Sequence, residues 1–336
     1  MNNNKYYLGF ILSIISISFL CIVFLLTGKH SPAVPVDEQS SKIVAESVSR
    51  ESASSIDESS AESLEKSEEE SKESIGEIDK ENLPFFNSID ELMTTMLEKY
   101  DIDTSNTAIA YYNFNSNESF QLNSDIAMMA ASTNKVTTAV MFTDLVNQSS
   151  LTWDTLFPYN PGLYEEGGGT VTNGVPKPSY TLEELVYESL YYSDNTAWNM
   201  LIDWYYRYIG DFQQGLKIAS GVEFTDPNID IINYATADML LSILHKVATQ
   251  PEYEFIKETM LESQEGIFLK REVVDGFGAK YGQYEDNFHD IGFYLQDGVP
   301  QYLIVVLTRN GAGNELFLGD LNLQLRQFNE DQFHSF

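Results

Sequence analysis

The sequence predicts an α/β fold of the α+β type, in which one antiparallel sheet takes its strands from both ends of a domain. One observation behind this is a strand-like pattern near residues 107–122. A second is a set of strand-like segments between residues 272 and 308. A third is the helical spacing of apolar residues in much of the chain between them. We therefore expect a sheet flanked by helices, with an all-helical subdomain inserted between its N-terminal and C-terminal strands.

The elements before the inserted region are predicted from local spacing. Apolar residues recur at helical intervals over 89–100, which indicates an amphipathic helix. Residues 107–112 read as a strand, and the turn at 115–118 pairs it with 119–122 as a hairpin. The next segment, 128–146, is helix-like.

The remaining elements complete the pattern. A helix is expected to open at 180–185, with Thr181 as its N-cap and Glu184 three residues later, as in a capping box. Another helix is predicted over 236–247. Three strands and a closing helix follow, at 272–276, 290–294, 302–308 and 315–328.

The N-terminal segment reads as a membrane anchor. Residues 6–28 carry no charge, and about 21 apolar residues in a helix span roughly 30 Å, the thickness of a bilayer core. A cleaved signal peptide is the alternative, but its apolar region is usually shorter, about 7–15 residues, and ends in a small-x-small site that is missing here. Because Lys5 and Lys29 flank the segment almost equally, charge does not decide its orientation. The predicted location, a single-pass cell-membrane protein with an extracytoplasmic domain, rests on the function inferred below.

Composition divides the rest of the chain. Residues 31–82 are mostly Ser and Glu and hold no aromatic residue, so they cannot bury enough surface to offset the entropy of ordering. We predict a disordered or partly helical linker over 29–82 and a folded domain over 83–336.

The charge balance excludes one class of partner. The chain carries a net charge of -32, and by count the region 83–336 alone holds 36 acidic and 12 basic residues. Nucleic-acid binding requires a basic surface and is therefore not expected. Cys21 is the only cysteine, so no intrachain disulfide can form. The four histidines are scattered without metal-ligand spacing, and neither a metal nor a cofactor is predicted.

The first chemical motif is Ser132-Thr133-Asn134-Lys135. On a helix, positions i and i+3 share a face, which would place the lysine amine beside the serine hydroxyl. A serine is a weak nucleophile until a base takes its proton, and a half-buried lysine can serve as that base. In isolation the pattern also fits a helix N-terminus with an exposed lysine.

Two further motifs follow in order, Ser193-Asp194-Asn195 and Lys280-Tyr281-Gly282. In a catalytic interpretation, Ser193 relays a proton to the leaving group and Asn195 donates a hydrogen bond to a substrate carbonyl. Lys280 would supply a cation for a substrate carboxylate, and Gly282 would allow close backbone approach. The structural alternatives are a helix cap for the second motif and an exposed strand lysine for the third. Asp194 is expected to hold its loop.

Taken together, the three motifs resemble those of the penicillin-recognising serine enzymes, most closely the class A β-lactamases. The resemblance covers roughly residues 83–336 and implies a β-lactamase/transpeptidase-like fold. It also implies an acyl-enzyme on Ser132, with Lys135 as base or sharing that role through a water, and with oxyanion donors from the backbone of Ser132 and Gln283. Supporting stretches are residues 166–170, 182–185, 193–202 and 289–292.

Two departures from that family stand out. Its third motif has Thr or Ser where this chain has Tyr281, whose phenol cannot occupy the same place as the smaller hydroxyl. The family's Glu-x-x-x-Asn loop, whose Glu activates the water that releases the acyl group, has no clear counterpart. Glu223, Asp226 and Asp230 are possible substitutes.

Three functions follow from these observations. The first is a membrane-anchored serine hydrolase that acts on a β-lactam or a related amide. The second is a D,D-peptidase or penicillin-binding-type enzyme that forms an acyl-enzyme on cell-wall peptides. The third is a non-catalytic cell-wall binding module. The expected partner is a small-molecule or peptide-like acyl substrate, together with the membrane through the N-terminal helix.

Overall fold

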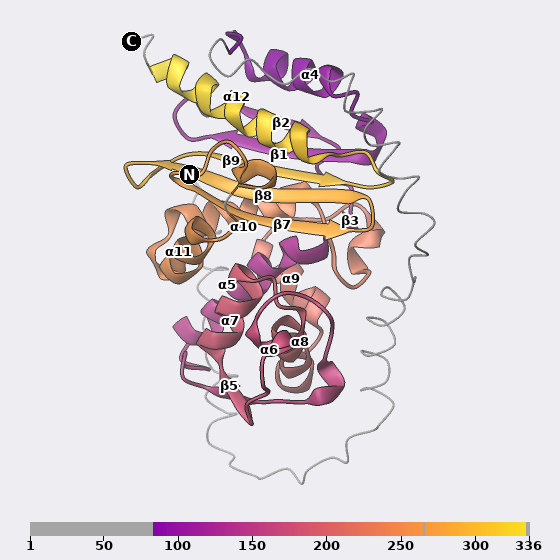
Figure 1. The fold of residues 1–336 in the computed structure, drawn as a ribbon, viewed down its shortest axis with the longest axis vertical. Coiled ribbons are helices and arrows are strands. Elements are labelled where there is room, and N and C mark those ends of the chain that lie inside the picture. Colours follow the sequence, from indigo (N-terminus) through magenta and orange to yellow (C-terminus); the bar gives the residue numbers. More distant parts are fainter. Residues whose placement is uncertain (1–82, 265, 334–336) are drawn as a thin grey trace, which may run out of the picture. The chain divides into compact units, whose positions relative to one another are not determined.

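The computed structural model describes residues 83–264 and 266–333 (Figure 1). The predicted anchor at 6–28 and the predicted linker at 29–82 lie outside the described residues. Within the described part, no helix is both long enough and apolar enough to cross a membrane.

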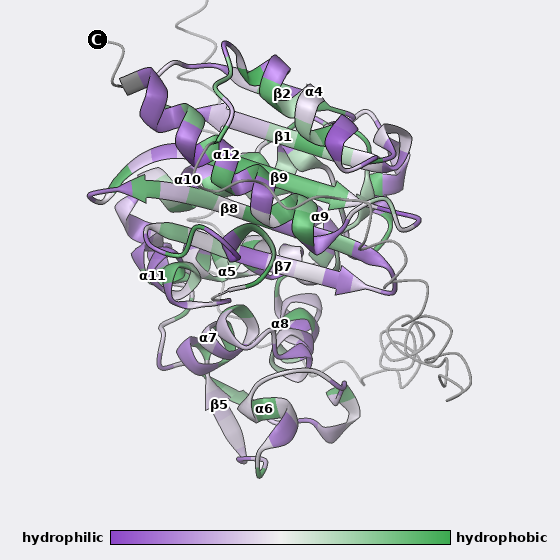
Figure 2. Cartoon of the chain, turned by 45° about the horizontal axis from the view of Figure 1, so that its top comes forward, coloured by the Kyte–Doolittle hydropathy of each residue, from purple (hydrophilic) through white to green (hydrophobic). Residues whose placement is uncertain are grey.

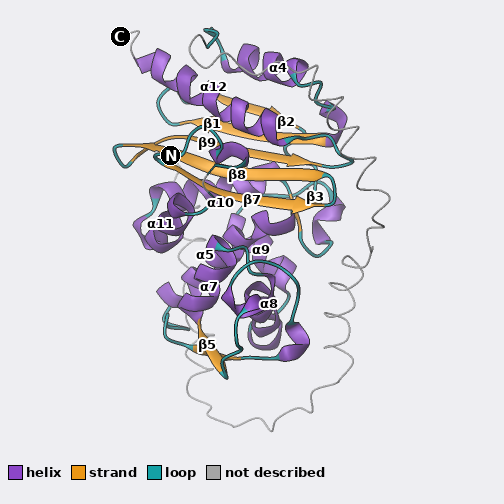
Figure 3. Ribbon diagram, in the orientation of Figure 1, coloured by secondary structure: helices purple, strands orange, loops and turns teal. Residues whose placement is uncertain are grey.

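A five-stranded antiparallel sheet lies at the centre of the described region, with the strand order β2-β1-β9-β8-β7 (Figure 3). Its strands come from both ends of the domain, which confirms the predicted fold class. β7 is an edge strand, so one of its sides is open to other parts of the chain. The strands are β1 Thr107–Asn113, β2 Ser119–Leu122, β7 Phe277–Tyr284, β8 Asn287–Gln296 and β9 Val299–Thr308.

The described α-helices fall into two groups. The terminal helices are α4 (Ile89–Lys99) and α12 (Glu315–Phe333). The inserted region is helical apart from two short antiparallel pairs, β3 (Met128–Met129) with β6 (Tyr234–Ala235) and β4 (Leu156–Pro158) with β5 (Ser179–Thr181). Its helices are α5 (Asn134–Asn147), α6 (Thr170–Asn173), α7 (Leu182–Tyr191), α8 (Asn195–Tyr208), α9 (Phe212–Ser220), α10 (Ala237–Thr249) and α11 (Glu254–Glu262).

Helices cover both faces of the sheet. Figure 1 shows α4 and α12 on one face, and α10 with the inserted helices on the other. Successive side chains of a strand point to opposite faces, and β1 follows this rule. Ala108 and Ala110 pack in the core on the α10 side, whereas Ile109 and Tyr111 pack in the core with α4 and α12. The central strands are accordingly coloured as hydrophobic along much of their length in Figure 2. Two buried cores therefore pack against the sheet, one on each face.

Several predicted boundaries are confirmed. Thr181 caps α7 in a full capping box with Glu184, and Thr236 caps α10. The predicted helix at 128–146 is wrong at its start, because residues 128–129 form β3 and α5 begins only at Asn134. Ala131 has a positive φ of 48°, which interrupts any continuous helix there.

The predicted strand at 272–276 is also wrong. The amide of Phe277 donates to the carbonyl of Val274 in a turn, and Gly276 has a φ of 74°. That conformation favours glycine and is incompatible with an extended strand. β7 therefore starts at Phe277, which brings the third motif to the middle of the edge strand.

Candidate active site

Three segments distant in the sequence meet at the N-terminus of α5. Ser132 lies in the 3-10 turn Ala131–Thr133, Ser193 lies in the turn between α7 and α8, and Lys280 lies in β7. Lys135 Nζ is 3.1 Å from Ser132 Oγ and 3.3 Å from Ser193 Oγ. Lys280 Nζ is 3.1 Å from Ser193 Oγ. Ser193 thus connects the two lysines, and the three motifs form one cluster.

Lys135 is fully buried, and its nitrogen contacts two oxygens that can only accept hydrogen bonds. These are the Ser193 carbonyl at 2.8 Å and Asn195 Oδ1 at 2.6 Å. Burial, followed by the charge of Lys280, lowers the pKa of Lys135 well below its usual range, against the opposing effects of Glu165 and Asp194. A neutral amine has two N–H groups and one lone pair. Because the two obligate acceptors take both N–H groups, the lone pair is left for the hydroxyls, among which Ser132 Oγ is the nearer.

The second motif is a strained turn held by its aspartate. Ser193 has a positive φ of 57°, which is uncommon for a residue with a side chain. Asp194 is fully buried and accepts hydrogen bonds from the amides of Val171, Thr172 and Ala197 at 2.8–3.0 Å and from the Thr172 hydroxyl at 2.8 Å. Asp194 therefore joins the starts of α6 and α8, as the sequence predicted for a loop-holding residue.

Asn195 and the glycine-rich segment form a further part of this wall. Asn195 Nδ2 donates to the Glu166 carbonyl at 2.6 Å, which leaves one of its two N–H groups for a substrate. A Cβ on Gly167 would lie 2.9 Å from Asn195 Nδ2, and one on Gly168 would lie 2.0 Å from the Tyr192 carbonyl. The segment at 167–168 therefore passes too close to the second motif to carry side chains.

Gly282 brings β7 close to the predicted nucleophile. A Cβ at this position would lie 3.0 Å from both Ser132 N and Ala130 O, so no side chain fits without a backbone shift. The N–H of Tyr281 points out of the sheet edge, where it donates to Gln264 Oε1 at 2.7 Å. Because outward-facing N–H groups recur at every second residue of an antiparallel strand, the N–H of Gln283 points to the same edge. The backbone of Gln283 is therefore directed toward the side on which Ser132 lies.

Comparison with known proteins identifies the family. A family model described as the β-lactamase enzyme family matches residues 87–321. The chain belongs to this β-lactamase family. No curated protein sequence matches it.

Solved structures support the fold of this β-lactamase family member. The structure of PBP-A has a TM-score of 0.61 and 20% identity, with coverage of 74% of this chain and 100% of that chain. A β-lactamase from Sphaerobacter thermophilus has a TM-score of 0.61 and 20% identity, with coverage of 72% and 97%. A class A β-lactamase from Mycobacterium abscessus has a TM-score of 0.57 and 17% identity, with coverage of 71% and 98%. At these identities the likeness establishes the architecture alone.

The third motif of this chain differs from that of the family at Tyr281. The structure shows where the Tyr281 side chain lies. Its ring stacks on Phe268, with the ring centroids 5.2 Å apart and the planes 17° apart. The Lys280 ammonium lies 4.3 Å from the centroid of the same ring. The ring therefore lies beside the lysine of the third motif and contacts it directly.

The acids that could replace the family's loop glutamate are engaged elsewhere or exposed. Asp226 accepts from the amides of Ala127 and Asn228, Asp230 pairs with Lys217, and Glu223 is exposed. Among the described residues, no carboxylate forms a hydrogen bond with the side chains of Ser132, Lys135 or Ser193. The two lysines and two serines therefore have no hydrogen-bonded carboxylate among the described residues, although the charges of Glu165 and Asp194 act on Lys135.

The sequence analysis missed the residues that support β7. Buried Asp290 accepts from the amides of Leu269 and Ile291 at 3.0 and 2.9 Å and from Gln264 Nε2 at 2.7 Å. Gln264 in turn binds Tyr281. Burial raises the pKa of Asp290 to about 7 and lowers that of Lys280 to about 7, while each charge partly offsets the effect on the other. The only signal in the sequence was the stretch at 289–292, which was used for the resemblance and not for a support role.

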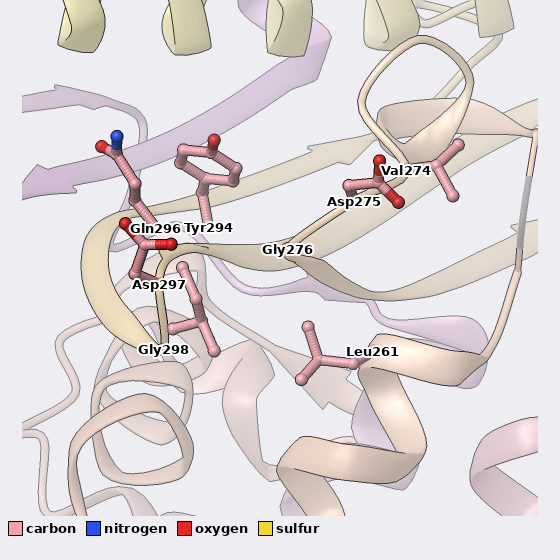
Figure 4. A pocket seen from close by; sticks show the side chains of 9 residues that line it. Leu261, Val274, Asp275, Gly276, Tyr294, Gln296, Asp297 and Gly298 are labelled. Atoms are coloured by element: carbon pink, nitrogen blue, oxygen red, sulfur yellow. The ribbon is translucent and has the colours of Figure 1, made fainter.

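A surface pocket lies apart from this cluster. It has a volume of about 540 Å³ and lies where the start of β7 faces the turn between β8 and β9 (Figure 4). Its lining includes Leu261, Asp275, Tyr294 and Asp297, and none of the motif residues. It brings together no pair of a nucleophile and a base, so it is not a candidate for the chemistry of the motifs.

Proposed function

We propose that this chain is a serine hydrolase that forms an acyl-enzyme on Ser132 with a β-lactam or a related amide. The observation that carries the proposal is the position of Lys135, whose buried amine lies 3.1 Å from Ser132 Oγ while two obligate acceptors occupy its N–H groups. An amine held in this way is suited to accept the serine proton.

The reaction then follows from the distances. As Ser132 Oγ attacks the substrate carbonyl carbon, Lys135 takes the hydroxyl proton and the carbonyl oxygen gains the negative charge. The N–H groups of Ser132 and Gln283 would stabilise that charge; one such donor contributes about 3–4 kcal/mol in a well-studied hydrolase. The proton passes from Lys135 to Ser193 Oγ, 3.3 Å away, and Ser193 gives its own proton to the leaving nitrogen. The C–N bond breaks, and the acyl group remains on Ser132.

The second candidate, an acyl-enzyme former of the penicillin-binding type, is favoured by one specific observation. Among the described residues no carboxylate is hydrogen-bonded to the side chains of Ser132, Lys135 or Ser193, so the water that must release the acyl group has no base held directly against the nucleophile. We therefore expect slow deacylation. The membrane anchor and the extracytoplasmic location remain proposals from the sequence, and they fit action on cell-wall peptides equally well.

A labelling experiment tests both candidates. The full-length chain is incubated with a fluorescent penicillin and, separately, with a chromogenic cephalosporin, beside Ser132→Ala and the exposed-serine control Ser150→Ala. We expect a covalent adduct in the wild type and in Ser150→Ala, and none in Ser132→Ala. A lasting adduct with little colour change supports the penicillin-binding type, whereas rapid turnover supports a β-lactamase. Labelling that survives in Ser132→Ala would refute the proposed nucleophile.

A further inference from the structure

Each of the three N–H directions of the Lys280 ammonium already faces another group of the protein. Its nitrogen lies 3.1 Å from Ser193 Oγ, 2.9 Å from the Tyr281 carbonyl and 4.3 Å from the centroid of the Tyr281 ring. The side chain is 1% exposed. An ammonium has three N–H groups, and here two face oxygens and the third side faces a π-system. No donor of Lys280 remains for a carboxylate arriving with a substrate.

The Tyr281 ring cannot easily move aside. It stacks on Phe268, whose own ring packs against Phe288 with the centroids 5.8 Å apart. The backbone N–H of Tyr281 is fixed by Gln264, which is fixed by Asp290. The ring also gains a cation–π contact with Lys280, which is stronger where the cation is desolvated. A carboxylate would therefore have to displace a residue that is held through its ring and its backbone.

Charge around the site also disfavours an anion. Burial lowers the pKa of Lys280 to about 7 and that of Lys135 well below its usual range, so burial disfavours the charged form of both lysines. The region 83–336 holds 36 acidic and 12 basic residues by count, which repels anionic ligands over the surface as a whole. Neither the local charge nor the overall charge would attract a carboxylate in place of the covered Lys280 ammonium.

From these contacts we infer that Tyr281 makes this site select acyl donors whose leaving side is uncharged, such as an ester or amide of the carboxyl group next to the scissile bond. Donors that carry a free carboxylate at that position are disfavoured. This inference rests on the proposed function, because it names the substrate class that Ser132 attacks. Tyr281 acts here as a specificity-determining residue through its ring, which covers Lys280 and occupies the place where a smaller hydroxyl would leave room for a carboxylate.

The test compares one acyl donor in two charge states. The full-length chain is incubated with benzylpenicillin and, separately, with its methyl ester, and the rate of adduct formation on Ser132 is followed by intact-protein mass spectrometry. Each rate is divided by the rate of alkaline hydrolysis of the same compound, which removes the intrinsic difference in ring reactivity. We expect the ester to acylate about tenfold faster or more, because the carboxylate of the acid would be left without a donor in the site, whereas the ester has no charge to satisfy.

Two variants identify the cause of that preference. Tyr281→Thr uncovers Lys280 and introduces a small hydroxyl, so the ratio of ester to acid is expected to fall about tenfold. Tyr281→Phe keeps the ring and is expected to keep the wild-type ratio. A Tyr281→Phe ratio that falls like that of the Thr variant would overturn the role of the ring.

The wild-type result separates this inference from the proposed function. If the acid acylates Ser132 as fast as the ester or faster, the selection for uncharged donors is overturned while the acyl-enzyme proposal stands. If neither compound labels Ser132, the proposed function fails and this inference fails with it. Because the deciding measurement uses the wild-type chain, a variant that does not fold leaves that decision unaffected.

Discussion

Two buried aspartates support the two walls of the site, and they do so in different ways. Asp194 supports the helical wall by accepting four hydrogen bonds from the starts of α6 and α8. Asp290 supports the sheet-edge wall by accepting three, of which two come from the backbone and one from Gln264. Both side chains are fully buried.

The difference lies in what each carboxylate stabilises. Asp194 binds helix N-termini, whose unpaired N–H groups and partial positive charge favour an anion. Asp290 lies within a strand near the covered Lys280, and burial raises its pKa to about 7. The helical wall is thus anchored mainly by backbone groups, whereas the sheet-edge wall depends on a side-chain relay through Gln264 and on a carboxyl group close to protonation.

The largest effect is expected from Asp194→Ala. This change leaves the buried amides of Val171, Thr172 and Ala197 without an acceptor, and each such group costs about 1–3 kcal/mol. We expect the free energy of unfolding, measured by urea titration, to fall by about 3 kcal/mol or more. Labelling of Ser132 should be lost as well, because the turn that holds Ser193 has no other anchor of this kind among the described residues.

A matched control distinguishes this support role from a general effect of removing an acid. Asp203→Ala removes a carboxylate from α8 that pairs with Arg207 at the surface, and such pairs contribute only about 0–1 kcal/mol. If Asp194→Ala destabilised the chain no more than Asp203→Ala, the helical wall would not depend on the buried carboxylate.

A smaller effect is expected from Asp290→Asn. The amide retains one accepting oxygen, so at least one of the donors on Leu269, Ile291 and Gln264 faces an N–H group instead. We expect a loss of about 1–3 kcal/mol in urea titration. Asp297→Asn, in the exposed turn between β8 and β9, is the control and should change stability by less than about 0.5 kcal/mol. Equal stability of the two variants would contradict the support role of Asp290.

The sequence predicted the helical wall better than the sheet-edge wall. Ser132, Lys135, Ser193 and Asn195 lie together in the structure, and the distances within each of their motifs are fixed by a few residues of backbone. Asp194 was expected to hold its loop, and it does, because helix caps follow local rules. The antiparallel sheet built from both ends of the domain was also recoverable, since alternation marks strands and strands must pair.

The sheet-edge wall could not be predicted because its contacts are not local. Phe268 reaches Tyr281 from an irregular 3-10 turn in which Phe268 has a φ of 49°, and Gln264 also has a positive φ, of 62°. No spacing rule places such residues. The prediction of a strand at 272–276 is wrong for the same reason. Its apolar residues suggested an extended conformation, but the chain turns at Gly276.

The smallest effect is expected in the pH dependence of the gap in stability between wild type and Asp290→Asn. The folded-state pKa of Asp290 is raised from 3.8 to about 7, so between these values the folded chain binds more protons than the unfolded chain. The stability contributed by protonated Asp290 is therefore full at low pH and is lost as the pH rises through about 7. The amide of the variant has no proton to bind, so the gap in stability should widen as the pH falls.

Over the single unit from pH 7 to pH 6 one proton can contribute at most about 1.4 kcal/mol, and we expect about 1 kcal/mol. Urea titrations of both proteins at the two pH values measure it, and a gap that did not change between them would mean that Asp290 is ionised in the folded chain and that the sheet-edge wall is anchored by charge.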